Sequence, residues 1–145
     1  MVSGAKGAVE RAMAIAKARG AKRALPLPVS APFHCALMQP AAFAMAAALA
    51  TTTILEPKVP LVANVGASPL SDPEAIRASL VAQVTGAVRW RESVQFMATH
   101  GVDRFVEIGA GKVLAGLAKR IAANASAISV GTPADVEAYK GARVL

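Results

Sequence analysis

The sequence predicts an α/β fold in which short strands alternate with helices. Three observations carry this prediction: helical and extended patterns take turns along the chain, several segments begin with helix-capping signals, and 54% of the 145 residues are hydrophobic. A chain of this length and composition can bury a core and is too apolar for disorder. Strands separated by helices favour parallel pairing with right-handed crossovers.

The first part of the chain begins with a helix over residues 10–19, which Gly20 ends. Residues 22–29 form a short extended run with two prolines. Residues 36–50 are Ala-rich and apolar on most faces, so we expect a largely buried helix there. Residues 59–65 then predict a strand, because a proline near a strand start is tolerated.

Capping signals define the later helices. Asp72 as N-cap and Pro73 at the first helical position open one helix. A second short helix carries Trp90 and ends at Gly101. The remaining expected elements are a strand over 103–109, a helix over 111–123, a strand over 127–131 and a last helix opened by Thr132, Pro133 and Asp135.

The chain is basic. Its 16 Lys and Arg against 9 Asp and Glu give a net charge of +7, with Lys17, Arg19, Lys22 and Arg23 close together. An excess of this kind predicts an acidic partner, although basic residues also suit the last turn of a helix. With one Trp and one Tyr there is little to stack on bases, so we do not expect nucleic acid as the partner.

Nothing in the sequence predicts export or membrane insertion. The apolar runs are shorter than a membrane span, and charges interrupt the N-terminal segment where a signal peptide would be apolar. The single Cys35 cannot form an internal disulfide, which agrees with a reducing compartment. We therefore predict a cytoplasmic protein that makes no membrane contact.

His34 is the first candidate for chemistry, because it lies where an extended run meets a predicted helix. A His at such a point is suited to general base catalysis near neutral pH, and equally to a structural hydrogen bond. Cys35 is its sequence neighbour and therefore a poor catalytic partner, so we expect a small buried hydrophobe. His34 and His100 lack the spacing of metal ligands, and we predict no metal site.

The run of residues 109–112, GAGK, invites comparison with a phosphate-binding loop. The pattern is too short for one, and Val113 stands where Ser or Thr is needed. It predicts a tight turn from strand to helix. A nucleotide-binding domain is therefore the weakest of the functional hypotheses.

Four longer blocks carry a resemblance to a known family. In order along the chain they are KRALPLPVSAPFHCALMQPAA, VPLVANV, LVAQVTGAVRWRESVQFM and VEIGAGKVLAGLAKRI. Their order and spacing resemble the C-terminal part of bacterial malonyl-CoA:acyl carrier protein transacylase, a family of fatty acid synthesis. The resemblance implies a hydrolase-like parallel-sheet core over residues 29–145, preceded over residues 1–28 by the remnant of a ferredoxin-like small subdomain.

The resemblance also implies a reaction. A Ser would attack the malonyl thioester of coenzyme A, and the acyl-Ser would pass malonate to the phosphopantetheine thiol of an acidic acyl carrier protein. No cofactor would be bound, since coenzyme A and phosphopantetheine are the arms of the two substrates. His34 matches the general base, and the backbone carbonyl of Gln83 matches the group that orients it. Gln83 would then need no particular side chain.

Two further residues match substrate-binding positions. Asn64 resembles a polar residue beside the active site. Phe33 resembles the aromatic residue that precedes the base in malonyl-selective members, where it would exclude an α-methyl branch. The alternative is that Phe33 is only a core side chain that anchors the loop.

The family's nucleophile does not occur in this sequence. None of its eight Ser residues has Gly both two before and two after it, as the G-H-S-x-G elbow requires. The early Gln of the oxyanion hole and the Arg that pairs with malonate have no counterpart here either. We therefore expect a C-terminal segment that is inactive alone and self-associates through an exposed apolar surface; the alternative is a non-catalytic module that binds acyl carrier protein.

Overall fold

The computed structural model describes residues 2–142, which divide into two compact units at the junction between Val88 and Arg89. Each unit contains two strands and several helices, and each is described by itself. The division expected from the family at residue 28 stays a prediction. No helix in the described part of the chain is long and apolar enough to cross a membrane.

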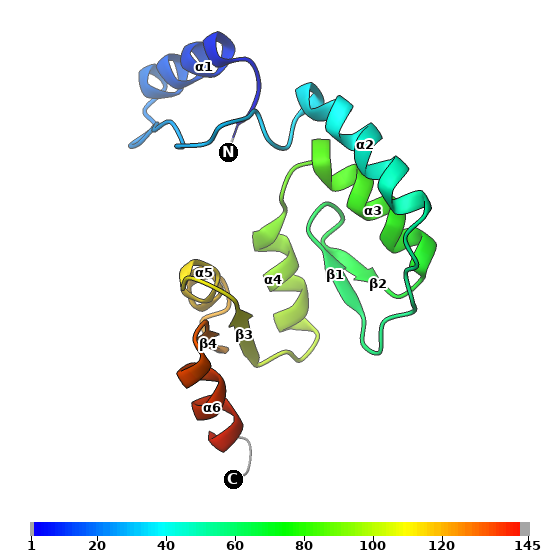
Figure 1. Ribbon diagram of the computed structural model, residues 1–145. Helices are drawn as coiled ribbons and strands as arrows, with labels where there is room; N and C mark the ends of the chain where they lie inside the picture. The colour runs from blue at the N-terminus through cyan, green and yellow to red at the C-terminus, as the bar shows by residue number, and fades with distance from the viewer. Residues whose placement is uncertain (1, 143–145) are drawn as a thin grey trace. The chain divides into compact units, whose positions relative to one another are not determined.

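The first unit opens with helix α1, Lys6–Ala18, which confirms the helix expected there (Figure 1). Gly20 ends it with a φ of +88°, a left-handed conformation that glycine adopts without cost. After an irregular stretch come the 3-10 helix η1, Ala36–Met38, and helix α2, Gln39–Ala50. The predicted helix over 36–50 thus exists in two pieces.

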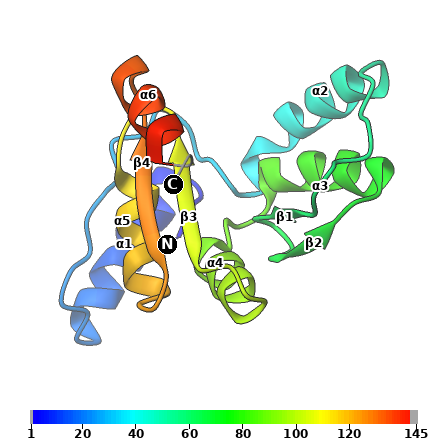
Figure 2. The same cartoon turned by 90° about the horizontal axis from the view of Figure 1, so that it is seen from below.

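The expectation that this helix is largely buried is wrong. Ala42 is the one buried residue of α2, all of which the structure describes, and Phe43 is 67% exposed. The apolar residues of α2 surround the helix, so a single neighbour can cover only one stripe of them. That neighbour is α3, Pro73–Thr85, which runs beside α2 in both views (Figures 1 and 2).

The strand expected at residues 59–65 is present as β1, Leu61–Ala63, but it does not pair in parallel. It forms an antiparallel hairpin with β2, Ser68–Leu70, a strand that the sequence analysis missed. The connecting turn is too short for the crossover that a parallel pair needs. Parallel pairing is therefore confined to the second unit among the described residues.

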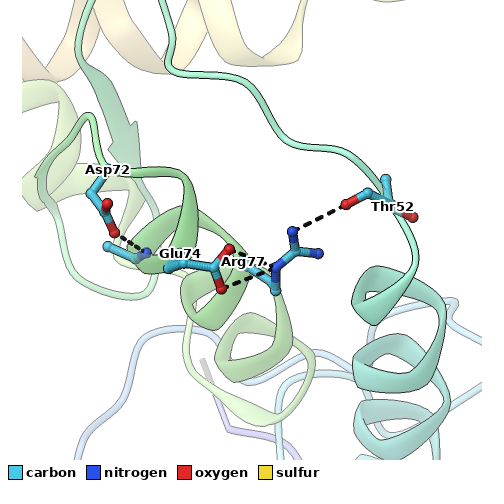
Figure 3. Close-up of polar contacts among 5 residues, drawn as sticks. Thr52, Asp72, Glu74 and Arg77 are labelled. Carbon is cyan, nitrogen blue, oxygen red and sulfur yellow. Dashed lines mark hydrogen bonds and ion pairs between the residues drawn. The ribbon is translucent and has the colours of Figure 1, made fainter.

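Polar contacts fix one end of the α2–α3 pair, where α2 ends and α3 begins (Figure 3). Asp72 caps α3 as predicted, since its Oδ2 accepts a hydrogen bond from the Ala75 amide at 2.7 Å. One turn further on, Arg77 lies 3.3 Å from Glu74 and donates through Nη2 to the carbonyl of Thr52 at 3.1 Å. Thr52 follows the last turn of α2, so Arg77 joins the two helices where one ends and the other begins.

The second unit alternates helices and strands as the sequence predicts. Its elements are α4 Trp90–Thr99, β3 Arg104–Ile108, α5 Val113–Ile121, β4 Ser126–Val130 and α6 Pro133–Ala142. Strands β3 and β4 pair in parallel, with the crossover through α5, which packs on both strands (Figure 2). Helix α4 packs against α5, and α6 against β4.

Small side chains form the core of this unit. Val94 of α4 is fully buried, and Ala115 and Ala118 of α5 meet it together with Ala127 of β4. Alanines let a helix approach strands closely, while the larger Trp90 packs at the edge of the cluster. The helical spacing of apolar residues over 113–121 predicted this helix. The face that carries its alanines is the buried one.

Glu107 of β3 ties β3, α5 and β4 together. Its carboxylate accepts hydrogen bonds from the amides of Ala115 and Leu114, at 2.9 and 3.2 Å, and from the Ser129 hydroxyl at 3.3 Å. These amides belong to the first turn of α5, where the helix itself offers no carbonyl acceptors. The Ala115 amide in particular, helped by Leu114 and Ser129, holds the pKa of Glu107 below its ordinary value against partial desolvation.

We predict that Glu107→Gln lowers the thermal unfolding midpoint at neutral pH, because an amide can offer these donors only one acceptor oxygen. A lowered folded-state pKa stabilises the fold above the unfolded-state pKa of about 4.3, and this contribution is lost as the pH falls through the folded-state value. The difference between Glu107→Gln and the unaltered chain should therefore shrink on acidification, as measured by circular dichroism melts from pH 7 to pH 3.

Glu137→Gln is the matched control. Glu137 pairs with Lys140 at 3.0 Å on the surface of α6, with both side chains at least 66% exposed, and exposed pairs contribute little. Equal shifts for the two variants at pH 7 would contradict the role given to Glu107.

Candidate active site

His34 lies on a tight turn just before η1. The turn is closed by the Cys35 thiol, which donates to the carbonyl of Pro32 at 3.1 Å, and His34 itself has a φ of +61°. A left-handed conformation is uncommon for a residue with a side chain, and it persists where the surroundings hold it in place. The expectation that Cys35 is buried is wrong. Cys35 is half-buried, and the hydrogen bond of its thiol stabilises the turn.

The surroundings that hold His34 are two backbone carbonyls at the end of α3. His34 Nδ1 lies 3.1 Å from the carbonyl oxygen of Gln83 and 3.1 Å from that of Gly86. Carbonyl oxygens only accept hydrogen bonds, so Nδ1 must carry the proton that it shares between them. Neutral His34 therefore has an unprotonated Nε2, the form that can take up a proton.

The physical origin of this arrangement is the end of a helix. The last carbonyls of an α-helix have no amide partners within it. Here the Gly86 amide bonds to the Ala82 carbonyl at 2.9 Å, and the next carbonyl, that of Gln83, is met by His34. The end of α3 thus supplies two acceptors for the Nδ1 proton without a carboxylate.

The β1–β2 turn lies against the same helix end. A Cβ built on Gly86 would come 2.7 Å from Val65 Cγ2 and 2.8 Å from the Ala82 carbonyl, so the backbone there is closely packed. Asn64 directly precedes Val65 and opens this turn. Asn64 is half-buried, and its side chain makes no hydrogen bond among the described residues.

Phe33 precedes His34 on the turn and is 44% exposed. It is therefore not a fully buried core side chain in this chain. His100 ends α4, where its Nδ1 lies 2.8 Å from the Phe96 carbonyl and its ring stacks on that of Phe96 with centroids 4.0 Å apart. His100 thus has a complete structural role of its own.

Residues 109–112 form the tight strand-to-helix turn that was predicted, with Gly109 and Gly111 at φ values of +130° and +103°. The described residues contain no group of three or more His, Cys, Asp or Glu placed to hold a metal ion. Sequence reasoning missed the Gly86 carbonyl, because the only signal for it is a Gly three residues after Gln83.

The fold and the site define an α/β protein with a His oriented by main-chain carbonyls, and comparison with known proteins gives the class. A solved acyl-carrier-protein-S-malonyltransferase from Bartonella henselae superposes with a TM-score of 0.88 and 53% identity, over 96% of this chain and 44% of that one. The chain therefore has the α/β acyltransferase fold.

Sequence comparison names the family. The chain is 51% identical over 138 residues to malonyl CoA-acyl carrier protein transacylase from Salmonella typhimurium. The match covers 95% of this chain and 45% of the relative, so the chain spans less than half the length of the curated relatives that it matches. No family model matches. The chain is a homologue of the malonyl CoA-acyl carrier protein transacylases, which confirms the resemblance found in its sequence.

One similar structure contains a partner. It is described as a type II PKS acyl-carrier protein in complex with its malonyl-transacylase, and this chain matches the transacylase with 47% identity and a TM-score of 0.86. The match covers 95% of this chain and 45% of that one. The acyl-carrier protein is the partner of that malonyl-transacylase.

We predict that neutral His34 is found as the tautomer with the proton on Nδ1, because both partners of Nδ1 are acceptors. Imidazole ¹⁵N chemical shifts, recorded above the pH at which the ring is protonated, distinguish the two tautomers. His100→Gln removes the only other imidazole and so assigns the signals. A majority of the tautomer with the proton on Nε2 would contradict the contacts with Gln83 and Gly86.

Proposed function

We propose that the chain is the part of a malonyl-CoA:acyl carrier protein transacylase that supplies the general base, His34. The observation that carries the proposal is the sharing of the Nδ1 proton between two carbonyls, which leaves Nε2 free to take a proton. The homology supports this proposal. Gln83 would orient the base through its backbone, and Asn64 would support the neighbouring turn.

In the proposed reaction His34 acts twice. Nε2 takes the proton of a Ser hydroxyl as the Ser oxygen attacks the malonyl thioester, and it returns that proton to the sulfur of coenzyme A as the C–S bond breaks. The phosphopantetheine thiol then gives its proton to Nε2 and attacks the acyl-Ser, and the Ser oxygen recovers the proton. The imidazolium present between these steps keeps its Nδ1 proton on the carbonyls at the end of α3.

The Ser would come from the portion of the transacylase that this chain does not span, since no Ser here lies in a G-H-S-x-G elbow. We propose malonyl-CoA and an acidic acyl carrier protein as partners, in the cytoplasm; the net charge of +7 supports the second of them. Large apolar side chains that are exposed, such as Leu55 at 78% and Ile108 at 83%, support our expectation that the chain self-associates. In the finer fold, residues 29–145 would belong to a hydrolase-like core and 1–28 to a ferredoxin-like subdomain.

Alone, the chain should form no malonyl adduct and transfer no malonyl group, because losing the nucleophile of a Ser and His pair costs about 10⁶ in turnover. Mixed with the segment of the Salmonella typhimurium transacylase that it does not match, it should transfer malonate to acyl carrier protein. His34→Ala should abolish that transfer, whereas His100→Ala should retain it. Transfer is measured with labelled malonyl-CoA.

Two outcomes would contradict the proposal. A malonyl adduct on one of the chain's own Ser residues would place the nucleophile within it. Binding of acyl carrier protein by the assembled pair, without any transfer, would favour a non-catalytic binding module.

We further propose that Phe33 contributes to selectivity for malonate. A bulky ring next to the base would crowd an α-methyl branch, and one methyl fitted or excluded changes selectivity by about 10- to 200-fold. In the assembled pair, Phe33→Ser should therefore raise the ratio of methylmalonyl to malonyl transfer. Phe43→Ser, on the exposed side of α2, is the matched control. An unchanged ratio with both activities reduced would show that Phe33 only anchors the loop.

A further inference from the structure

The side chain of Gln83 makes a contact that its main-chain role does not require. Its Nε2 lies 3.1 Å from the carbonyl oxygen of Gly86, the same oxygen that His34 Nδ1 approaches. A carbonyl oxygen can only accept, so the amide atom facing it must be the NH₂ group and not the oxygen. The Gly86 carbonyl thus receives two donors, one from the base and one from Gln83.

We propose that the Gln83 side chain is a positioning group for His34 and acts through the Gly86 carbonyl. The proposal rests on the proposed function, in which His34 is the base. It replaces the expectation that only the backbone of Gln83 matters. Gln83 would then hold the ring at two points, directly through its own carbonyl and indirectly through its amide.

The helix fixes the direction of the Gln83 carbonyl more firmly than that of the Gly86 carbonyl. The Gly86 carbonyl therefore requires a further contact to fix its direction. Gln83 lies in the last turn of α3, where helical geometry fixes its carbonyl direction. Gly86 lies beyond the helix with φ −83° and ψ 152°, and glycine has more backbone freedom than any other residue. The Gly86 amide is bonded to the Ala82 carbonyl, but this bond leaves rotation about ψ open. The Gln83 amide restricts that rotation.

Orientation of the Gly86 carbonyl has a chemical consequence. With both acceptors in place, the ring is held with its proton on Nδ1. If the Gly86 carbonyl turns away, Nδ1 keeps one acceptor, and the tautomer with the proton on Nε2 becomes more accessible. That tautomer cannot accept the proton of a Ser. The Gln83 side chain would therefore raise the fraction of His34 that is competent as a base.

The test measures the tautomer ratio of His34 in the chain itself, by imidazole ¹⁵N shifts. Gln83→Met keeps the length of the side chain and removes the donor, and Gln83→Asn keeps the amide one carbon too short to reach. Gln83 is half-buried, and a helix tolerates both Met and Asn, so the fold should persist. Gln95→Met is the matched control, because Gln95 is exposed on α4. Circular dichroism melts accompany each variant.

Both Gln83 variants should raise the ratio of Nε2–H to Nδ1–H tautomer by about 2- to 10-fold, which is the factor expected for one net hydrogen bond. Gln95→Met should leave it unchanged. An unchanged or lowered ratio in either folded Gln83 variant would overturn the proposal, since it would show that the Gly86 carbonyl needs no tether. A loss of melting cooperativity together with an unchanged tautomer ratio would assign Gln83 a purely structural role. That result would also overturn the proposal.

The outcome is separable from that of the proposed function. The tautomer ratio is measured without substrate or nucleophile, so it can change even if the assembled pair transfers no malonate. In that case the positioning role stands and the reaction assigned to His34 falls. Where transfer occurs, a Gln83 variant should lower kcat and leave the KM for malonyl-CoA nearly unchanged, because the effect is on the base.

Discussion

The bond between His34 and the end of α3 is the constraint on which the site depends. One Nδ1 proton is shared between the carbonyls of Gln83 and Gly86, each 3.1 Å away. This single contact joins a turn at residue 34 to a helix end some fifty positions later. It also selects the tautomer, and therefore decides which nitrogen is free for chemistry.

Several local features serve this contact. The left-handed backbone of His34 and the Cys35 thiol bond shape the turn that carries the ring. The Asp72 cap fixes where α3 begins, and Arg77 ties it to the end of α2, so the helix is held at its start while its last turn meets the ring. A helix end has unpaired carbonyls, which are the kind of acceptor that a carboxylate would otherwise supply. The acceptors that meet the base directly are thus backbone carbonyls.

Much of the fold could be predicted from the sequence, because its signals are local. Asp72 with Pro73, and Thr132 with Asp135, marked helix starts that the structure confirms. The alternation of helical and extended patterns after residue 89 predicted the parallel pairing of β3 and β4, which the structure confirms. The hairpin was missed because Ser68–Leu70 is only three residues long and contains a proline. The exposure of α2 was missed because an apolar composition does not tell how many neighbours a helix has.

The site was less accessible to sequence reasoning. Position alone left His34 equally suited to catalysis and to structure, and only the family resemblance singled out Gln83. Carbonyl groups have no sequence signature, so the Gly86 acceptor could not be found from residue types. The same holds for the Gln83 amide, whose partner is defined by how the chain leaves the helix.

Coupling across the hydrogen bonds of His34 tests the central claim most directly. In chain labelled with ¹⁵N and ¹³C, an NMR experiment that detects scalar coupling through hydrogen bonds should connect the imidazole Nδ1 to the carbonyl carbons of both Gln83 and Gly86. The Nδ1 proton should also exchange slowly with water, because two acceptors hold it. An Nδ1 proton that exchanges rapidly and couples to neither carbonyl would show that the ring faces solvent, and would contradict this account of how the base is held.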